Sequence, residues 1–160
     1  MSSDRTEELQ LVTFQLGAEF YGIDIMQVKS IEETKEVRPI PNSPGYVEGI
    51  FNLRGEIIPV INLHKRFHLA SGQTDDDDGL LRGFLIIRVE EMHVAIIIDK
   101  VSRVLAVQSR EVQQPPQMIS GIGAEYIEGV VQRDDGYLII LDIERLFNLR
   151  ELAQLESLAR

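Results

Sequence analysis

An internal repeat constrains the fold of this 160-residue chain more than any other feature of its sequence. Residues 46–69, YVEGIFNLRGEIIPVINLHKRFHL, are matched 80 positions later by residues 126–149, YIEGVVQRDDGYLIILDIERLFNL. Five positions are identical, and most other positions exchange like for like. In each copy two apolar runs flank a short polar turn, which predicts two strands joined as a hairpin. We therefore expect the chain to fold as two similar halves.

A second match supports the duplication. Residues 22–31, GIDIMQVKSI, resemble residues 95–104, AIIIDKVSRV, at an offset of 73 positions. Each segment belongs to a pair of apolar runs joined by a turn, so both halves have the same order of strands. The two offsets differ by seven residues, and we expect these residues in the stretch 113–123, which is rich in proline and glycine.

Short strands with regular turn signals account for most of the chain, and helical periodicity begins only after residue 142. This pattern predicts a mainly β fold with two barrel-like halves of about five strands each. Residues 26–31 fit either a strand or a helical turn. The predicted divisions are a disordered N-terminus (1–8), a first barrel (9–69), an acidic linker (70–79), a second barrel (80–149) and a C-terminal helix (150–160).

Composition narrows the class of partner. The chain carries 16 Lys and Arg against 26 Asp and Glu, which gives a net charge of −10. Nucleic acids and anionic membranes need a basic footprint, so neither is an expected partner. The chain has no cysteine, and no apolar run approaches the roughly 20 residues of a membrane span. Because the N-terminus is polar and acidic, unlike a signal peptide, we expect a cytoplasmic protein that binds other proteins.

The sequence offers little for catalysis or metal binding. His64 and His68 lie four positions apart, as ligands on one helix face would, but Lys65 and Arg66 between them disfavour a bound cation. The sequence has no phosphate-binding loop and no nucleophile elbow. We therefore expect no enzyme activity and no cofactor. A small metal-dependent enzyme using His64 and His68 is the alternative from another functional class.

Arg54 lies at the turn of the first hairpin, where an arginine beside a leucine needs an explanation. One reading is that Gly55 supplies the positive φ of the turn and Arg54 is simply solvated. The other is that its planar guanidinium meets a carboxylate, on this protein or on a partner. The second hairpin has Arg-Asp-Asp-Gly at residues 133–136, so the two halves differ in charge at this turn.

Two apolar pairs occupy matching positions in the halves, Val28 with Ile31 and Val101 with Val104. Either these residues belong to the barrel cores, or one member of each pair faces outward. In the second case they would form exposed apolar patches, which mark partner surfaces.

These residues resemble the CheW family of coupling proteins in bacterial chemotaxis. The resemblance covers residues 9–149 and is carried by YGIDI at 21–25, GIFNLRGEIIPVINL at 49–63, DKVSRV at 99–104 and the Tyr126-x-x-Gly129 motif. It implies two SH3-like five-stranded barrels without catalysis. It also implies an adaptor between the cytoplasmic tips of chemoreceptors (methyl-accepting chemotaxis proteins) and the regulatory domain of the histidine kinase CheA, recruited to membrane-associated receptor arrays. The same fold occurs as a module of CheA and of receiver fusions, so a regulatory module is the alternative.

The resemblance also assigns roles by position. The family often has an acidic residue where this chain has Ser30, and Glu32 or Glu33 is the expected substitute as the partner of Arg54. The residues implied in kinase binding are Val28, Ile31, Glu32 and Arg54. The residues implied in receptor binding are Gly49, Ala95, Val101 and Val104.

Overall fold

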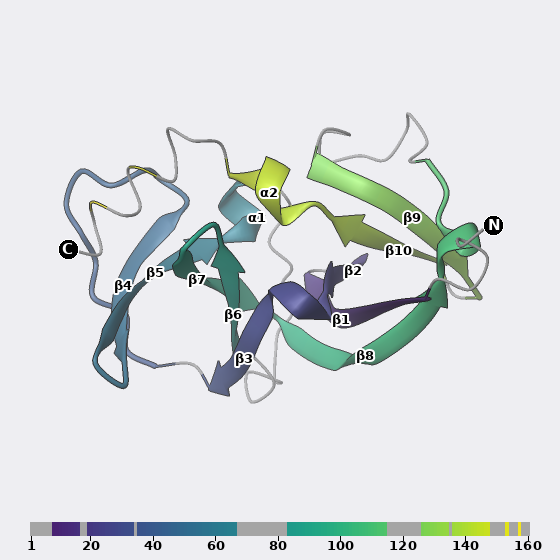
Figure 1. Ribbon diagram of the computed structural model, residues 1–160. Helices are drawn as coiled ribbons and strands as arrows, with labels where there is room; N and C mark the ends of the chain where they lie inside the picture. The colour runs from purple at the N-terminus through teal and green to yellow at the C-terminus, as the bar shows by residue number, and fades with distance from the viewer. Residues whose placement is uncertain are drawn as a thin grey trace.

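Ten strands in two five-stranded sheets make up most of the described part of the computed structural model (Figure 1). The structure describes residues 8–16, 19–33, 35–66, 83–114, 126–134, 136–147, 153 and 157, with the backbone alone at 100–102. The strands are β1 (Glu8–Leu16), β2 (Glu19–Asp24), β3 (Val28–Glu33), β4 (Val47–Leu53), β5 (Glu56–Asn62), β6 (Gly83–Val89), β7 (Met92–Ile98), β8 (Lys100–Gln108), β9 (Ile127–Arg133) and β10 (Gly136–Leu141). The short helical elements are η2 (Ile25–Gln27), α1 (Leu63–Arg66), η4 (Ser109–Glu111) and α2 (Ile143–Leu146).

Each sheet takes strands from both halves of the chain. Sheet A has the order β8-β1-β2-β10-β9, and sheet B has the order β3-β6-β7-β5-β4. The hairpin β1–β2 therefore lies among strands of the second half, and the hairpin β6–β7 among strands of the first. Figure 1 shows this exchange as two lobes, with β1 and β2 beside β8 to β10 and with β6 and β7 beside β3 to β5.

The exchange contradicts the predicted division into consecutive barrels at 9–69 and 80–149. After β2 the chain passes through the three residues of η2 directly into β3 of the other sheet. After β7 it passes through Asp99 alone into β8. Neither connection contains a turn that would return the chain to the strand it has just left, so the chain continues into the neighbouring sheet.

The two sheets are nevertheless equivalent under the internal repeat. The repeat pairs β3 with β8, β6 with β1, β7 with β2, β5 with β10 and β4 with β9, which converts the order of sheet B into that of sheet A. The parallel pairs β5–β7 and β10–β2 also correspond. The predicted duplication and the mainly β fold class are thus confirmed, and the duplicated unit is completed by a hairpin from the other half.

The extra residues of the second half lie in two places rather than one. An isolated bridge joins Arg38 to Ile50, and its counterpart joins Gln113 to Val130. The first members of these bridges are 75 positions apart and the second members 80. Two of the seven extra residues therefore precede Gln113, near η4, and five follow it. The prediction that all seven lie in 113–123 was wrong for these two.

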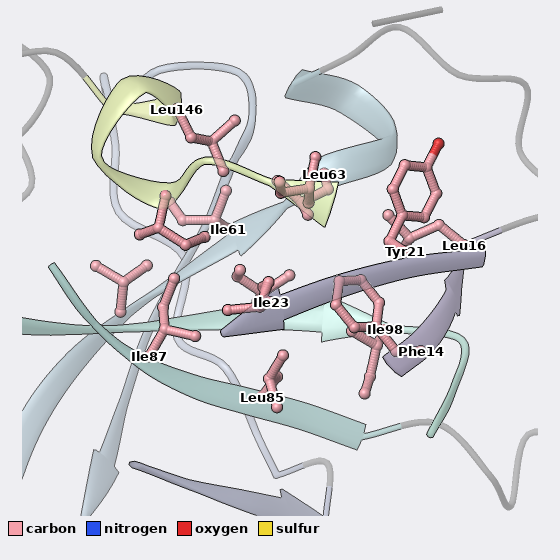
Figure 2. Close-up of a cluster of buried hydrophobic side chains, with 14 of the residues drawn as sticks. Phe14, Leu16, Tyr21, Ile23, Ile61, Leu63, Leu85, Ile87, Ile98 and Leu146 are labelled. Atoms are coloured by element: carbon pink, nitrogen blue, oxygen red, sulfur yellow. The ribbon is translucent and has the colours of Figure 1, made fainter. Parts of the chain in front are cut away.

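A shared hydrophobic core joins the sheets, and each sheet also has a smaller core of its own. Figure 2 shows Phe14, Tyr21 and Ile23 of sheet A in the same cluster as Leu85 and Ile87 of sheet B. The core confined to sheet B comprises Phe51, Leu53, Ile58, Val60, Phe84, Ile86 and Ala95. The core confined to sheet A comprises Leu11, Val107, Val131, Leu138 and Ile140.

This arrangement explains why β6 is apolar on both faces. Side chains alternate across a strand. In β6, Phe84 and Ile86 enter the core of sheet B, whereas Leu85, Ile87 and Val89 enter the shared core. A strand covered on both sides reads as a continuous hydrophobic run, as β6 does.

The remaining predictions at the ends and connections have mixed outcomes. The ambiguous segment 26–31 contains both alternatives, because η2 is followed at once by β3. Glu8, placed in the predicted disordered terminus, begins β1. The predicted linker 70–79 lies outside the described residues, as does the predicted C-terminal helix apart from Ala153 and Ser157, which are helical. Within the described part of the chain, no helix has the length and apolar character needed to cross a membrane.

Candidate partner-binding surfaces

Exposed apolar side chains occur at matching positions in the two halves. Among the described residues the large exposed ones are Met26, Ile31, Ile57, Val104 and Tyr137, at 84%, 46%, 36%, 53% and 50% of full exposure. The repeat pairs Ile31 on β3 with Val104 on β8, and Ile57 after the β4–β5 turn with Tyr137 after the β9–β10 turn. Isolated exposed apolar residues are ordinary, but two equivalent pairs on one molecule indicate two related surfaces.

We call the first of these surface B, which comprises Ile31, Glu32, Arg54 and Ile57. Arg54 Nη1 lies 3.6 Å from Glu32 Oε2, with the arginine side chain 72% exposed and the glutamate 13%. Glu32 Oε2 also accepts a hydrogen bond of 2.9 Å from Ser30 Oγ. Since β3 and β4 are opposite edges of sheet B, the ion pair connects the two edges and brings the β4–β5 turn to β3.

The turn that presents Arg54 is built from local rules. Arg54 and Gly55 both have positive φ, at 51° and 93°. This is the backbone of a two-residue hairpin turn with φ > 0 at both central positions. The Asn52 side chain accepts a hydrogen bond of 2.9 Å from the Gly55 amide and so holds the turn closed. The turn projects the Arg54 guanidinium beyond the end of the hairpin.

The second of these surfaces, surface A, comprises Val104, Asp134 and Tyr137. The repeat places Asp134 where surface B has Arg54, and Leu105 where surface B has Glu32. Leucine cannot form an ion pair, so surface A lacks the counterpart of the Arg54–Glu32 contact. The surfaces therefore share apolar positions but carry opposite charges at their turns.

A second polar contact is also specific to sheet B. His93 Nδ1 on β7 lies 2.7 Å from Glu56 Oε2 at the start of β5. The repeat places Phe20 and Gly136 at the equivalent positions of sheet A. The His93 side chain is partly buried, at 23% of full exposure.

Gly49 is required by the close approach of a neighbouring segment. It is buried with φ = 148°, where side chains are strained. A Cβ at this position would overlap the carbonyl oxygen of Arg38 and lie 2.8 Å from Val37 Cγ1. The Arg38 segment is held against β4 by Arg38 N–H donating to the Ile50 carbonyl at 2.8 Å and by the reverse bond at 3.0 Å.

Glu48 and Glu128 occupy matching positions in the repeat, but their pKa values are shifted in opposite directions. Burial alone would raise the pKa of Glu48, but hydrogen bonds from Lys65 and Asn62, each 2.9 Å, together with the Lys65 charge, lower it below the ordinary value. The repeat places Glu128 at the same site. There partial burial, followed by the charges of Asp142 and Asp24, raises the pKa of Glu128. Burial is the largest cause of the raised pKa of Glu128, and the exchange of Asn62 for Asp142 adds to it by replacing a hydrogen-bond donor with a negative charge.

A family model described as the CheW-like domain matches residues 10–151. The chain belongs to the CheW family. Chemotaxis protein CheW of Treponema pallidum is 59% identical over 152 residues, covering 95% of this chain and 89% of that protein. Chemotaxis protein CheW of Klebsiella aerogenes is 31% identical over 151 residues, covering 94% and 89%.

A solved structure supports the same assignment. The crystal structure of the scaffolding protein TtCheW from Thermoanaerobacter tengcongensis superposes with a TM-score of 0.79 at 30% identity, covering 94% of this chain and 95% of that chain. The CheW fold here therefore consists of two SH3-like β subdomains, one around each sheet. CheW proteins are non-catalytic scaffold adaptors of chemotaxis, and this chain belongs to that class of protein.

The metal-enzyme alternative gains no support from the histidines. His64 Nε2 lies 3.1 Å from Asp99 Oδ2, so this ring contacts a carboxylate. His68 lies outside the described residues. Across the described ranges, no group of three or more possible ligands is placed to hold a metal ion.

Of the residues implied in kinase binding, the fold brings Glu32 and Arg54 into contact. Ile31, Glu32 and Arg54 lie on surface B, and Val28 on the same strand is half-buried against the shared core. One member of the Val28/Ile31 pair therefore faces outward, as the second reading of this pair requires. Glu32, rather than Glu33, is the partner of Arg54.

The residues implied in receptor binding do not form one surface. Val104 is exposed on β8, whereas Gly49 and Ala95 are buried within sheet B. The side chain of Val101 lies outside the described set. Receptor contact by Gly49 and Ala95 stays a prediction, and in this conformation they would act through the residues they support.

Ile57 and Tyr137 are the surface residues that the sequence analysis missed. Both lie in apolar runs, in which the buried and exposed positions look alike. The signal was available in the repeat itself, because the two residues occupy matching positions just after the two turns.

Proposed function

We propose that this CheW-family chain couples the cytoplasmic tips of chemoreceptors to the regulatory domain of the histidine kinase CheA. The observation that carries the proposal is the presence of two equivalent exposed surfaces, A and B, one on each subdomain. A protein that links two partners needs two faces, and exposed apolar positions are the ordinary basis of such faces. The net charge of −10 and the family membership agree with protein partners.

Surface B is the proposed kinase side. The ion pair joins Glu32 to Arg54, Ile31 is the exposed neighbour of Glu32 on β3, and half-buried Val28 packs against the shared core. An exposed arginine beside an apolar residue combines two contact types that are enriched at protein interfaces. Surface A, which includes exposed Val104, is the proposed receptor side.

The test is a binding experiment with purified components. The chain is mixed with a CheA regulatory domain and with a receptor signalling fragment, and we expect each to co-elute with it. Ile31→Ser should weaken kinase binding by roughly tenfold, the scale of one interface anchor, and leave receptor binding unchanged. Val104→Ser should do the opposite.

Lys29→Ser, an exposed polar position on β3, is the matched control and should change neither affinity. Absence of association with both partners would overturn the proposed function. A fluorescent fusion should form membrane-associated foci in cells that contain receptor and kinase, and should be diffuse in cells that lack them.

A further inference from the structure

Arg66 at the end of α1 bridges the two subdomains. Its guanidinium carbon lies 5.3 Å from the ring centre of Tyr46 and 5.0 Å from that of Tyr126, which is cation–π range. Its Nη2 donates to the carbonyl of Leu146 at 3.1 Å and to the hydroxyl of Tyr126 at 3.3 Å. Tyr46 precedes β4 of sheet B, whereas Tyr126 and Leu146 belong to the side of sheet A.

The two tyrosines occupy equivalent positions in the repeat. The Tyr46 carbonyl accepts a hydrogen bond from the Asn62 amide at 2.8 Å, and the Tyr126 carbonyl accepts one from the Asp142 amide at 2.9 Å. Each ring is thus anchored through the backbone to the end of the second strand of its own hairpin. Figure 1 draws α1 and α2 between the two lobes, and the Arg66 contacts with Tyr46, Tyr126 and Leu146 place its guanidinium at this junction.

The two halves of the repeat carry different residues at the Arg66 position. The repeat pairs Arg66 with Leu146, which is fully buried. Two arginines would repel one another at this junction, and two leucines would leave the Tyr126 hydroxyl without this donor. One arginine opposite one leucine lets a single guanidinium contact both rings and the backbone of the other half.

We propose that Arg66 is a latch that fixes the angle between the two β subdomains. The shared core between the sheets is apolar, and burial of apolar surface is non-directional. Its apolar contacts carry no charge or hydrogen-bond geometry that would by itself define one angle between the sheets. A planar guanidinium that contacts two rings and donates to a backbone carbonyl has a defined orientation. The chain crosses between the sheets through η2 and through Asp99, which are short enough to act as pivots.

The latch sets the spacing between surfaces A and B. Its consequence for binding rests on the proposed function, since it requires a partner on each surface. Loss of the latch would then weaken simultaneous binding of two partners more than binding of either one alone. The angle itself can be measured without any partner, so failure of the latch and failure of the proposed function are distinguishable.

The experiment is a distance measurement across the full-length protein. The chain has no cysteine, so Glu91→Cys on the sheet B side and Gln132→Cys on the sheet A side can carry two spin labels at exposed positions. Pulsed electron paramagnetic resonance then gives the distribution of label distances. With Arg66 present we expect a single narrow peak. Arg66→Met keeps an unbranched apolar stem but removes the charge and the fork, and we expect the narrow peak to be lost while far-ultraviolet circular dichroism is unchanged.

Arg145→Met is the matched control, because Arg145 is the exposed arginine of α2 and pairs with Asp142 in its own helix at 3.5 Å. It should leave the narrow peak intact. An unchanged narrow peak in folded Arg66→Met would overturn the latch, because the core alone would then fix the angle. If Arg66→Met does not fold, Arg66→Lys decides. A broadened distribution supports the latch, and the original narrow peak overturns it.

Discussion

Arg54 lies in the turn of a hairpin with a backbone that favours glycine, yet its side chain is almost free in solvent. Its φ of 51° is imposed by the turn, and its ion pair with Glu32 spans two edges of sheet B. Because the arginine side chain is mostly exposed, water and salt screen the pair, and such pairs contribute little to stability. This exposure and small stabilising effect fit the proposed role of Arg54 in kinase binding.

Arg54→Gln should therefore leave the protein folded and weaken kinase binding. The substitution keeps a side chain at the same φ, so it isolates the loss of charge. We expect the free energy of unfolding to fall by about 0.5 kcal/mol or less, as for other exposed ion pairs. Chemical denaturation measures this change, and co-elution with the kinase domain measures binding. Arg133→Gln, at an exposed position beside the other turn, is the control and should leave kinase binding unchanged. A large loss of stability in Arg54→Gln would instead show that Arg54 has a structural role.

Glu48 and Glu128 provide a matched pair for pH dependence. The lowered pKa of Glu48 means that its contribution to stability is present above its unfolded value of about 4.5 and is lost as pH falls through the folded pKa. The raised pKa of Glu128 has the opposite sign, since its ionised form is disfavoured in the folded state.

At pH 7, Glu48→Gln should be less stable than the wild type and Glu128→Gln more stable. Each difference should be about 0.5 kcal/mol or less because these groups are partly exposed, and each should shrink in acid as the wild-type carboxylates become protonated. Urea denaturation at pH 7 and at pH 4 measures both effects. The same direction of change in both variants at pH 7 would contradict the assignment.

At the scale of elements, β4 shows how one glycine lets another segment complete a sheet edge. Sheet edges expose unpaired backbone groups, and here the Arg38 segment covers part of the β4 edge with two hydrogen bonds. The approach is so close that no Cβ fits at Gly49. The sequence placed Gly49 in a strand correctly, but the neighbour that requires glycine there is about ten residues away and follows no local pattern.

Gly49→Ala should move the Arg38 segment away from β4. Because the obstacle is a backbone carbonyl rather than a flexible side chain, and because φ is positive, we expect a loss of roughly 2–4 kcal/mol. Hydrogen exchange at the amides of Arg38 and Ile50 should accelerate. Gly45→Ala is the control, since nothing lies within 4 Å of a Cβ there, and it should change neither stability nor exchange. Unchanged protection in Gly49→Ala would refute the role of this glycine.

At the scale of the whole molecule, the exchange of hairpins makes the two subdomains interdependent. Sheet A without β1 and β2 would lose the hairpin that joins β8 to β10, and sheet B depends in the same way on β6 and β7. The shared core adds a contiguous apolar contact between the sheets. Neither sheet has all its strands unless both halves of the chain are folded.

Unfolding should therefore be a single cooperative transition. Ile58→Ala removes packing only from the core of sheet B, and Leu138→Ala only from that of sheet A. Each should cost about 2–5 kcal/mol, as other buried truncations do, and lower the melting temperature of the entire molecule. Calorimetry with spectroscopic probes in both sheets measures this. Two separate transitions in either variant would show that the subdomains unfold independently.

The sequence by itself determined the elements and the family. The repeat predicted ten strands in two similar halves because strand periodicity and turn chemistry are local properties. The motif residues identified the CheW family, and Arg54 was singled out because the two turns differ in charge. The resemblance narrowed the acidic partner of Arg54 to two neighbouring glutamates, and nothing in the sequence chooses between them.

The tertiary structure decided how those elements combine. Which hairpin enters which sheet depends on pairing between segments far apart in the chain, and periodicity within a strand carries no information about its neighbour. The choice of Glu32, the outward face of Ile31 and the exposure of Ile57 and Tyr137 all follow from that pairing. The Arg66 contacts likewise exist only because the exchanged hairpins bring the two halves of the repeat face to face.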